Sequence, residues 1–352
     1  MYTIQTLNKN EFEEIVYCRD EKVGLNAIIA IHDTTLGPGT GGARMYFYQR
    51  EEEALNDVLR LSFGMTYKAA ISHLPFGGGK SVIIGDPERI KTEALLLRFG
   101  EYVESLKGRY ICAKDVGING ADLRIIARKT NHILGVEGLK NSSGDPSPAT
   151  AYGVVQAIRA ISKEYLNRNS LEGLKFAVQG LGSVGHGIVE ELYNEGAELT
   201  VCDVDREAIG ETLKKCNVEG VDPQKIYDVK CDFFVPCAMG AVLNSDTIPR
   251  LQCKVVAGAA NNQLANVRDG YDLAKRGIFY APDYVINAGG LINIAEELPG
   301  YNRDRAFEHV AKIYQTMVEI IHRSRKEDEP PFVIADRIAQ EILTEAKRSH
   351  KP

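Results

Sequence analysis

Three ionisable residues stand where proton-transfer chemistry would be expected. Lys68 follows a helical pattern over residues 51–65, Lys80 opens an apolar run directly after three glycines, and Asp115 follows the strand-like run 109–112. Ligand sites of open α/β sheets lie at the carboxyl ends of strands, which is where Asp115 stands. A positioned lysine can act as a base, and a carboxylate beside it can relay protons. Lys80 and Asp115 are therefore the candidate catalytic pair.

A glycine-rich stretch with the spacing G-x-G-x-x-G lies between a strand-like run and a helical pattern. Its first glycine allows a tight turn, its second lets a pyrophosphate approach the backbone, and its third lets the helix pack on the strand. The helix N-terminus supplies free N–H groups for the phosphates. The positions predicted to bind the cofactor here are Gly180, Gly182, Ser183, Val184 and Gly185.

Asp203 ends the next strand-like run, residues 197–202. A carboxylate at this distance from the glycine turn can accept hydrogen bonds from both ribose hydroxyls, and it would repel a 2′-phosphate. The stretch 174–203 therefore predicts a βαβ unit that binds NAD rather than NADP. An ordinary glycine turn that serves only packing is the alternative.

The glycines of residues 37–44 imply backbone placed where side chains would obstruct, with an ordinary surface turn as the alternative. Residues 77–79 are expected to form a glycine-rich turn. A phosphate-binding loop at 77–80 is the other possibility that the glycines raise. Ser81 fits that pattern, but the glycine spacing and the strand-like run that follows do not.

Alternating strand-like and helical patterns run along nearly the whole chain, which predicts an α/β fold with a parallel, doubly wound sheet in its second half. Helices are expected at 51–65, 92–106, 151–165, 305–324 and 334–347, and the start of the chain up to Lys22 is mildly helical in pattern. We expect two α/β domains around a cleft. The first comprises residues 1–140 plus 330–352, for substrate binding and oligomerisation, and the second is a Rossmann domain over 141–329.

Two loops are expected at carboxyl ends of strands in the second domain, residues 236–240 and 258–262. Small side chains and amides there suit a planar nicotinamide and its carboxamide. The loops place Cys237, Ala238 and Asn262 near the expected cofactor.

Composition narrows the class of protein. The chain has 352 residues and a formal net charge of −6, which gives no reason to expect nucleic acid or an anionic membrane as partner. No apolar run reaches the length that spans a bilayer, and the first residues lack a signal-peptide pattern, so a cytoplasmic protein is expected. The seven cysteines form no C-x-x-C pair and the seven histidines show no ligand spacing, so reduced, mostly buried cysteines and no metal are expected.

Several motifs resemble those of the amino acid dehydrogenases that act on leucine, valine, phenylalanine and tryptophan, relatives of glutamate dehydrogenase. The resemblance covers nearly the whole chain, and its motifs are closest to leucine dehydrogenase. They are Ile31-His32-Asp33-Thr34-Thr35-Leu36-Gly37-Pro38, Gly64-Met65-Thr66-Tyr67-Lys68, Gly77-Gly78-Gly79-Lys80, Asp115-Val116-Gly117, Asn261-Asn262-Gln263-Leu264 and Ala281-Pro282-Asp283-Tyr284-Val285-Ile286-Asn287-Ala288-Gly289-Gly290. The resemblance implies NAD-dependent, reversible oxidative deamination of an L-amino acid to its 2-oxo acid and ammonia.

The resemblance also implies roles for single residues. Lys68, with the backbone of Gly41 and Gly42, would hold the substrate carboxylate. Lys80 would activate the water that attacks the imine, and Asp115 would exchange protons with the substrate amine. Two further residues are implied on the cofactor side: Asn262 would hold the nicotinamide or the substrate, and Thr150 would contact the nicotinamide. The sequence departs from the family at Lys114, which precedes the aspartate, and at Ile118-Asn119-Gly120.

The resemblance implies a side-chain pocket lined by Thr40, Ala69, Ala113, Leu291 and Ile294. These small and aliphatic residues favour a branched-chain substrate, with an aromatic amino acid as the alternative, since one or two methylenes change discrimination by only about 1–3 kcal/mol. No cation lines this pocket, which disfavours glutamate. A homo-oligomer is expected.

Two other classes of protein compete with this interpretation. A non-catalytic NAD-binding regulator would keep the glycine turn and Asp203 but has no need of Lys68, Lys80 and Asp115 together. A 2-hydroxy acid dehydrogenase would want a histidine base, for which only His32 and His73 are plausible.

Overall fold

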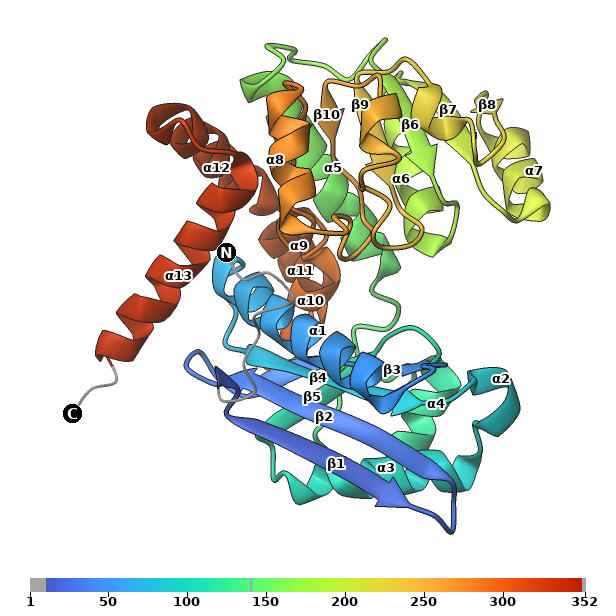
Figure 1. The fold of residues 1–352 in the computed structure, drawn as a ribbon, viewed down its shortest axis with the longest axis vertical. Helices are drawn as coiled ribbons and strands as arrows, with labels where there is room; N and C mark the ends of the chain where they lie inside the picture. The colour runs from blue at the N-terminus through green and yellow to red at the C-terminus, as the bar shows by residue number, and fades with distance from the viewer. Residues whose placement is uncertain (1–10, 140, 350–352) are drawn as a thin grey trace. The chain divides into compact units, whose positions relative to one another are not determined.

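The computed structural model describes residues 11–139 and 141–349 of the chain, which form two compact units. Of these described residues, unit 1 comprises 146–293 and 304–338, and unit 2 comprises those before 146, 294–303 and those after 338 (Figure 1). Each unit is built on one β-sheet. The α/β class expected from the sequence is confirmed.

The sheet of unit 2 has the strand order β1-β2-β4-β3-β5. The strands are β1 (Glu14–Asp20), β2 (Leu25–Asp33), β3 (Gly39–Tyr46), β4 (Gly77–Ile84) and β5 (Tyr110–Lys114). Strand β2 is antiparallel to β1 and β4, whereas β3 is parallel to both of its neighbours, β4 and β5. This order places β3 between the strand that carries Lys80 and the strand that precedes Asp115.

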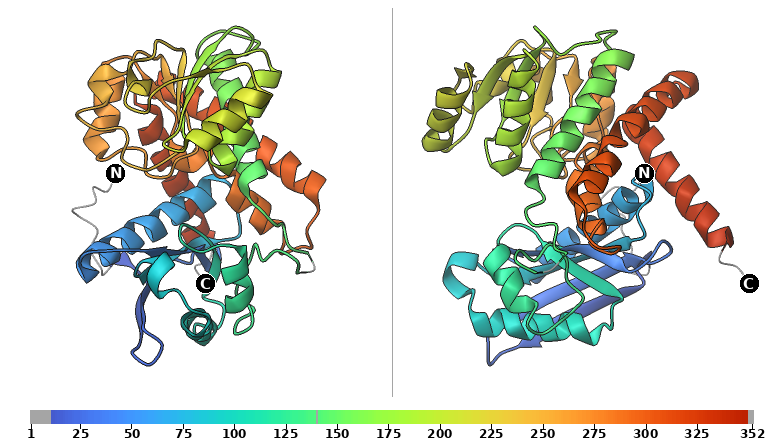
Figure 2. Two further views of the ribbon diagram at one scale, coloured as in Figure 1. Left: turned by 90° about the vertical axis from the view of Figure 1, so that its right-hand side faces the viewer. Right: turned by 180° about the vertical axis from the view of Figure 1, so that it is seen from behind.

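Helices cover both faces of this sheet (Figure 2). Helix α1 (Glu51–Ile71) begins with three acidic residues, which favours a helix N-terminus, and buries Ala54 and Val58 against β2. Helices α3 (Glu93–Ser105) and α4 (Gly120–Ile126) pack on the other face, where Phe99 and Leu123 join the main core of the unit. The short helix α2 (Pro87–Ile90) links β4 to α3.

Three expectations for unit 2 were wrong. Residues 14–20 are strand rather than helix, because they pair in antiparallel register with β2; residues 1–10 of that expectation lie outside the described part. Residues 77–79 belong to strand β4 rather than to a turn, and residues 39–44 belong to β3, which rules out the alternative of a surface turn there. Helix α1 continues to Ile71, so Lys68 lies in its last turn.

The sheet of unit 1 is entirely parallel, with the order β11-β10-β9-β6-β7-β8. Its strands are β6 (Lys175–Gln179), β7 (Glu198–Cys202), β8 (Glu219–Gly220), β9 (Phe233–Pro236), β10 (Val255–Val256) and β11 (Phe279–Tyr280). From β6 the chain first builds outward to β8 and then returns to the other side of β6 to add β9. This reversal confirms the doubly wound topology, and it places a switch point between β6 and β9.

The helices of unit 1 are α5 (Ser147–Glu164), α6 (Ser183–Asn194), α7 (Arg206–Lys215), α8 (Val267–Lys275), α9 (Asp283–Ile286), α11 (Arg303–Ala311) and α12 (Ile313–Glu327), while α10 (Gly289–Ala295) and α13 (Pro331–Ser349) each run from unit 1 into unit 2. Three of them, α6, α7 and α8, connect strands of this sheet, whereas α5 precedes β6 and the others follow β11. The single helix expected over 305–324 is two helices. The Lys312 N–H bonds to the carbonyl of His309, only three residues back, where they meet.

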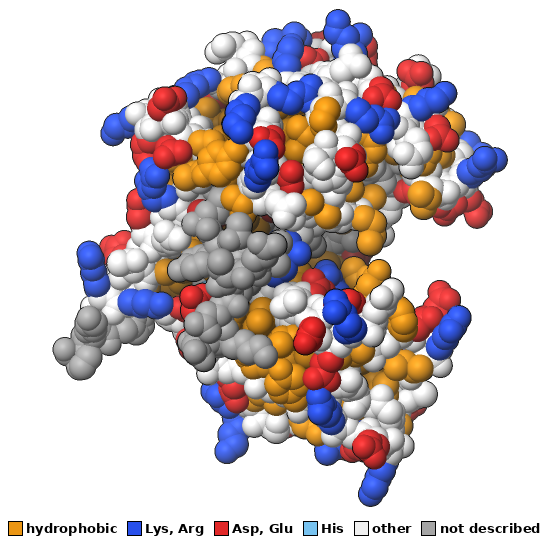
Figure 3. Space-filling view, in the orientation of Figure 1, with side chains coloured by type: hydrophobic (Ala, Val, Ile, Leu, Met, Phe, Trp, Pro, Cys, Tyr) orange, Lys and Arg blue, Asp and Glu red, His pale blue; other side chains and the backbone are white. Residues whose placement is uncertain are grey.

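The surface drawn in Figure 3 carries intermixed acidic and basic side chains on both units. No helix of the described residues is long and apolar enough to cross a bilayer. The seven cysteines, all in the described part of the chain, are free thiols, and five of them are buried: Cys18, Cys112, Cys202, Cys216 and Cys231.

Candidate functional site

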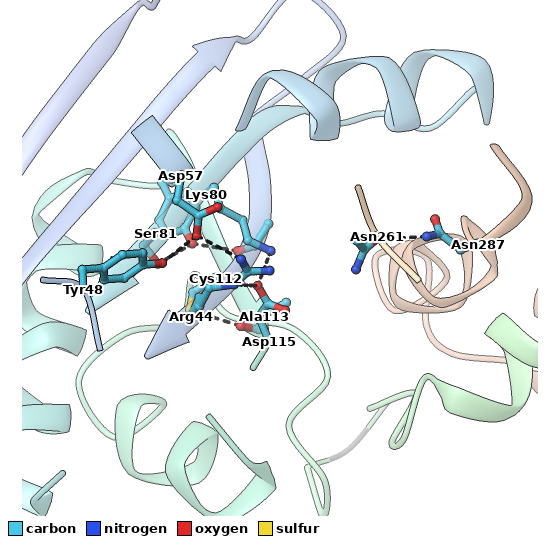
Figure 4. A network of polar contacts seen from close by, with 12 residues as sticks. Arg44, Tyr48, Asp57, Lys80, Ser81, Cys112, Ala113, Asp115, Asn261 and Asn287 are labelled. Carbon is cyan, nitrogen blue, oxygen red and sulfur yellow. Dashed lines mark hydrogen bonds and ion pairs between the residues drawn. The ribbon is translucent and has the colours of Figure 1, made fainter. Parts of the chain in front are cut away.

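Lys80 and Asp115 form a close ion pair in unit 2, shown in Figure 4. The Lys80 Nζ lies 2.7 Å from the Asp115 Oδ2, and their side chains are only 9% and 12% exposed. Lys80 comes from β4 and Asp115 follows β5, so the contact spans the intervening strand β3. The structure thus brings together the two residues that the sequence singled out as a catalytic pair.

Glycines in β3 leave the space for this contact. A Cβ atom at Gly42 would lie 2.7 Å from the Cβ of Asp115 and 2.5 Å from the carbonyl oxygen of Lys114. A Cβ atom at Gly41 would lie 1.9 Å from the carbonyl oxygen of Gly79. Side chains at either position would push the strands or the aspartate aside.

The ladder between β3 and β4 is interrupted beside Lys80. The register pairs Thr40 with Gly78 and Ala43 with Ser81, and it skips the residues between them, which include Gly41 and Gly42. The fully buried Tyr110 of β5 donates from its hydroxyl to the Gly41 carbonyl at 2.7 Å, and that hydroxyl also lies 2.9 Å from the Ser81 Oγ. Gly41 and Gly42 remain paired with Cys112 and Ala113 of β5. Where the pairing with β4 is missing, the Tyr110 hydroxyl binds the Gly41 carbonyl instead.

Two positively charged side chains, Lys80 and Arg44, surround the Asp115 carboxylate. Burial by itself would raise the pKa of the Asp115 carboxyl, but Lys80 and Arg44 outweigh it and hold that pKa below its usual value. The Arg44 Nε lies 3.2 Å from the same Oδ2 that Lys80 contacts, and its Nη1 lies 2.9 Å from the Asp57 Oδ2. Asp115 is thus an ionised acceptor with two cationic partners.

The other predicted substrate residues are mostly buried. Lys68 is half-buried in the last turn of α1, and the Thr40 hydroxyl, fully buried, donates to the Pro38 carbonyl at 3.0 Å. Ala69 and Ala113 are buried in unit 2, and Leu291 and Ile294 are buried one turn apart on α10. The Ile294 Cδ1 lies 3.8 Å from where a Cβ atom at Gly135 would be.

The loop after β5 explains the departure from the family pattern at residues 118–120. The Asn119 side chain accepts from the Asp122 N–H at 3.0 Å, and the Asp122 side chain accepts from the Asn119 N–H at 2.8 Å, which forms a capping box at the start of α4. The Lys91 Nζ also binds Asp122, at 2.7 Å, and the Gly117 carbonyl, at 3.0 Å. The segment that follows Asp115 is therefore anchored at both ends.

The glycine turn of unit 1 has the geometry that its spacing predicts. Gly180 has a φ of +99°, which favours glycine, and a Cβ atom at Gly185 would lie 2.0 Å from the Gly180 carbonyl oxygen. A Cβ atom at Gly182 would meet nothing within 4 Å, and the first turn of α6, which begins with Ser183 and Val184, has no side-chain cap. An open backbone at an uncapped helix N-terminus fits a pyrophosphate group.

Asp203 accepts two backbone hydrogen bonds around this turn. Its Oδ2 accepts from the Leu181 N–H at 2.6 Å, and its Oδ1 accepts from the Asp205 N–H at 2.8 Å. Each carboxylate oxygen can accept a further hydrogen bond, so the residue retains the capacity to bind ribose hydroxyls.

The carboxyl-end loops of β6 and β9 meet at the switch point. Ala238 lies against Gly180: a Cβ atom added at Gly180 would be 2.8 Å from the backbone N of Ala238. The Cys237 N–H donates to the Gln179 carbonyl at 2.7 Å. Burial raises the pKa of the Cys237 thiol to about 12, so this cysteine stays protonated.

Asn262 and Thr150 lie in two further parts of unit 1. Asn262 has a left-handed backbone, with a φ of +51°, and its carbonyl accepts from the Ala241 N–H at 2.7 Å. The Thr150 hydroxyl, in α5, donates to the Pro146 carbonyl at 3.0 Å and lies 2.7 Å from where a Cβ atom at Gly290 would be. Both residues are therefore fixed by local backbone structure.

Arg44 and Asn287 are polar residues near the predicted ones for which the sequence indicated no role. Arg44 could have been found by reading 39–46 as a strand, because period two places residues 42 and 44 on one face. The Asn287 Nδ2 donates to the Asn261 Oδ1 at 2.9 Å and the Ala259 carbonyl at 3.0 Å, while its buried Oδ1 has no partner among the described residues (Figure 4). In the sequence, only its place in the stretch 281–290 pointed to Asn287.

Neither plausible histidine resembles a catalytic base. The His32 Nδ1 lies 2.7 Å from the Thr66 Oγ1, and its ring packs between Phe12 and Phe63. Burial lowers the pKa of His32 to about 4, and His73 is exposed. Among the described residues, no group of three His, Cys, Asp or Glu side chains is arranged to hold a metal ion.

Comparisons with known proteins cover both units. A family model described as the dimerisation domain of Glu/Leu/Phe/Val dehydrogenase matches residues 13–132. A second, described as Glutamate/Leucine/Phenylalanine/Valine dehydrogenase, matches residues 143–209 and 203–329.

Individual proteins are similar over nearly the whole chain. A leucine dehydrogenase of Geobacillus stearothermophilus is 48% identical over 342 residues, 97% of this chain and 93% of that protein. A phenylalanine dehydrogenase of Lysinibacillus sphaericus is 45% identical over 336 residues, 94% of this chain and 88% of that protein. The crystal structure of L-tryptophan dehydrogenase from Nostoc punctiforme has a TM-score of 0.82 at 42% identity and covers 98% of this chain and 99% of that one.

Proposed function

The chain belongs to the Glu/Leu/Phe/Val dehydrogenase family and is an amino acid dehydrogenase, an oxidoreductase; on this premise we propose that it deaminates a branched-chain L-amino acid oxidatively and reversibly with NAD. The products are the 2-oxo acid and ammonia. The observation that carries the proposal is the buried Lys80–Asp115 pair beside the glycine backbone of β3.

The proposed roles follow from the charges at the pair. Hydride leaves the Cα only when the amine is neutral, so Asp115, an ionised acceptor, takes the proton of the substrate ammonium. Lys80 then positions and activates the water that attacks the imine and stabilises the developing negative charge. Lys68 and the backbone at Gly41 and Gly42 hold the substrate carboxylate.

The cofactor is assigned to unit 1, in which the open backbone at Gly182 and the uncapped start of α6 fit a pyrophosphate. NAD supplies the hydride acceptor when bound. Asp203 favours NAD, because its carboxylate can accept from the ribose hydroxyls and would repel a 2′-phosphate. Thr150, Cys237, Ala238 and Asn262 are proposed to lie along the nicotinamide half.

The substrate preference is proposed from the five residues of the expected side-chain pocket. Four are aliphatic and the fifth, Thr40, has its hydroxyl engaged with the backbone, so the lining offers no free charge to a substrate side chain. Leucine, valine and isoleucine match such a lining, since a buried carboxylate without a partner would be costly. The relatives that act on phenylalanine and tryptophan make an aromatic substrate the alternative.

A homo-oligomer is proposed as the assembly, because residues 13–132 match a domain described as a dimerisation domain. Sedimentation of the purified chain tests this: a species of 38.8 kDa alone would contradict it.

The activity test follows NADH absorbance with saturating NAD at alkaline pH and a panel of leucine, valine, isoleucine, phenylalanine, tryptophan and glutamate. We expect the highest kcat/KM with a branched-chain substrate and loss of NADH production in Lys80→Ala. The exposed Lys22→Ala serves as the matched control and should leave the rate unchanged.

The other outcomes separate the alternatives. A preference for phenylalanine or tryptophan would replace the branched-chain assignment, and a preference for glutamate would overturn the pocket argument. NAD binding without NADH production from any amino acid would favour a non-catalytic regulator.

A further inference from the structure

Arg44 is a third charged residue in direct contact with the Lys80–Asp115 pair. Its Nε lies 3.2 Å from the Asp115 Oδ2, the oxygen that the Lys80 Nζ approaches to 2.7 Å. The Arg44 side chain is only 17% exposed, so water screens this contact weakly. The two cations thus share one carboxylate oxygen.

Arg44 is held in place by two residues behind it. Its Nη1 lies 2.9 Å from the Asp57 Oδ2, and that same oxygen accepts from the Tyr48 hydroxyl at 2.6 Å (Figure 4). Asp57 comes from α1 and Tyr48 from the segment after β3, so two elements fix the guanidinium. Burial and the charge of Asp57 raise the pKa of the Tyr48 hydroxyl, which keeps it a donor.

Other titratable groups near Asp115 are either neutral or paired elsewhere, so Lys80 and Arg44 are the cations that stabilise its negative charge. Tyr110 and Cys112 of β5 are neutral, because burial raises the pKa of the Tyr110 hydroxyl and brings that of the Cys112 thiol to about 12. Lys114, its neighbour in the chain, is 40% exposed and faces Asp145 at 3.9 Å. In the segment that follows, Asp122 is paired with Lys91.

The two cations differ in one chemical property. A lysine ammonium can lose its proton, and the proposed role of Lys80 as a base requires that it do so. An arginine guanidinium does not deprotonate in proteins. When Lys80 is neutral, Arg44 is therefore the cation that remains on Asp115.

We propose that Arg44, anchored by Asp57 and Tyr48, is a positioning residue that keeps Asp115 ionised and oriented while Lys80 changes its protonation state. The inference rests on the proposed function, since it takes the role of Lys80 as a base from it. Arg44 then favours the ionised, proton-accepting form of Asp115 whether or not Lys80 is charged.

The test compares the pH dependence of kcat/KM in the full-length chain and in Arg44→Gln, with leucine and NAD. Loss of a neighbouring positive charge favours the protonated form of both Lys80 and Asp115, so the acid limb moves to higher pH whichever group sets it. We expect a shift of about 1–3 pH units and a lower kcat, with the affinity for NAD unchanged. If the acid side of the kcat/KM profile of Arg44→Gln coincides with that of the unsubstituted chain, the proposal is overturned.

Arg44→Lys separates charge from packing. The ammonium keeps the positive charge but lacks the fork that bridges Asp115 and Asp57. We expect the acid limb to stay near that of the parent while kcat falls. A limb displaced as far as in Arg44→Gln would exclude the charge role, and this variant carries the test if the glutamine variant fails to fold.

Arg98→Gln is the matched control. Arg98 is also paired with two carboxylates of unit 2, those of Asp20 and Glu101, both at 2.8 Å. Its removal should leave the pH profile unchanged, and a shift as large as that of Arg44→Gln would show that the effect is not specific to the site.

A second measurement keeps this inference separate from the proposed function. Infrared titration of the protonated carboxyl band, assigned by subtraction of the Asp115→Asn spectrum, reports on Asp115 without turnover. The midpoint should rise in Arg44→Gln even if no amino acid is oxidised, in which case only the proposed function fails. An unchanged midpoint, in an active enzyme, would remove the inference and leave the proposed function standing.

Discussion

Gly42 shows how one missing side chain makes room for the Lys80–Asp115 contact. The ion pair spans strand β3, and at Gly42 a Cβ atom would overlap with both the Asp115 Cβ and the Lys114 carbonyl. The neighbours are backbone and a short side chain, which cannot move away cheaply. The glycine is therefore part of the site although it carries no functional group.

Gly42→Ala should displace Asp115 and lower kcat/KM by about 100-fold, the effect of a misplacement near 1 Å. Overpacking should also cost about 1–3 kcal/mol of unfolding free energy. Steady-state kinetics and urea unfolding measure the two effects. Gly64→Ala is the control, because a Cβ there meets nothing within 4 Å in the middle of α1; it should stabilise the chain by about 0.5–1 kcal/mol. An alanine at Gly42 with normal kinetics would contradict the steric argument.

The second half of helix α13 binds residues of β2 and α1 in unit 2. The Lys347 Nζ lies 2.8 Å from the Asp33 Oδ2, and the Gln340 Nε2 donates to the Tyr67 hydroxyl at 2.9 Å. Burial alone would raise the pKa of the Asp33 carboxyl, but the bonds from Lys347 and Thr35 hold it below its usual 3.8. The carboxyl that closes β2 thus depends on a residue more than 300 positions away.

Lys347→Met should cost about 1 kcal/mol or less at neutral pH, because Lys347 is 58% exposed and water weakens the pair. The pKa of Asp33 is lower in the folded chain than its unfolded value of 3.8. The contribution of Asp33 to the free energy of unfolding is therefore present above pH 3.8 and is lost as the pH falls through the folded-state pKa. Urea unfolding of both proteins across this range should give curves that converge in acid. Arg348→Met, an exposed neighbour of equal charge, is the control; a pH-independent difference would contradict the assignment.

At the level of the whole molecule, each unit carries one part of the proposed chemistry. Unit 1 holds the glycine turn and Asp203, and unit 2 holds Lys80, Asp115 and Arg44. Cofactor binding should therefore be measurable without the catalytic pair.

NAD should raise the melting temperature of the chain, since a ligand that binds only the folded state at one hundred times its Kd stabilises it by about 2.7 kcal/mol. Asp203 should make NADP at the same concentration much less effective. Differential scanning fluorimetry measures both, and Lys80→Ala should keep the full response to NAD. Equal stabilisation by NADP would contradict the role of Asp203.

Local sequence patterns were sufficient for some of the helices and for the glycine turn after β6. Apolar spacing located α3 and α5 to within a few residues, and Gly180, Gly182 and Gly185 have the geometry that their spacing predicts. Both features depend on residues close together in the chain, so their signals are complete in the sequence. Lys80 and Asp115 were found for a similar reason, because each stands next to a recognisable apolar run, 81–84 for Lys80 and 109–112 for Asp115.

Only the tertiary structure showed which segments are strands when their pairing partners are far away in the sequence. The glycine-rich segments 39–42 and 77–79 resemble turns by composition, yet they are strands, because each is paired on both sides within the five-stranded sheet. The same pairing brings Arg44 to Asp115, 71 residues away. Strand order is set by packing between remote segments, which local periodicity does not encode. The sequence thus identified the residues proposed to react, and the pairing of the strands decided that Arg44 contacts Asp115.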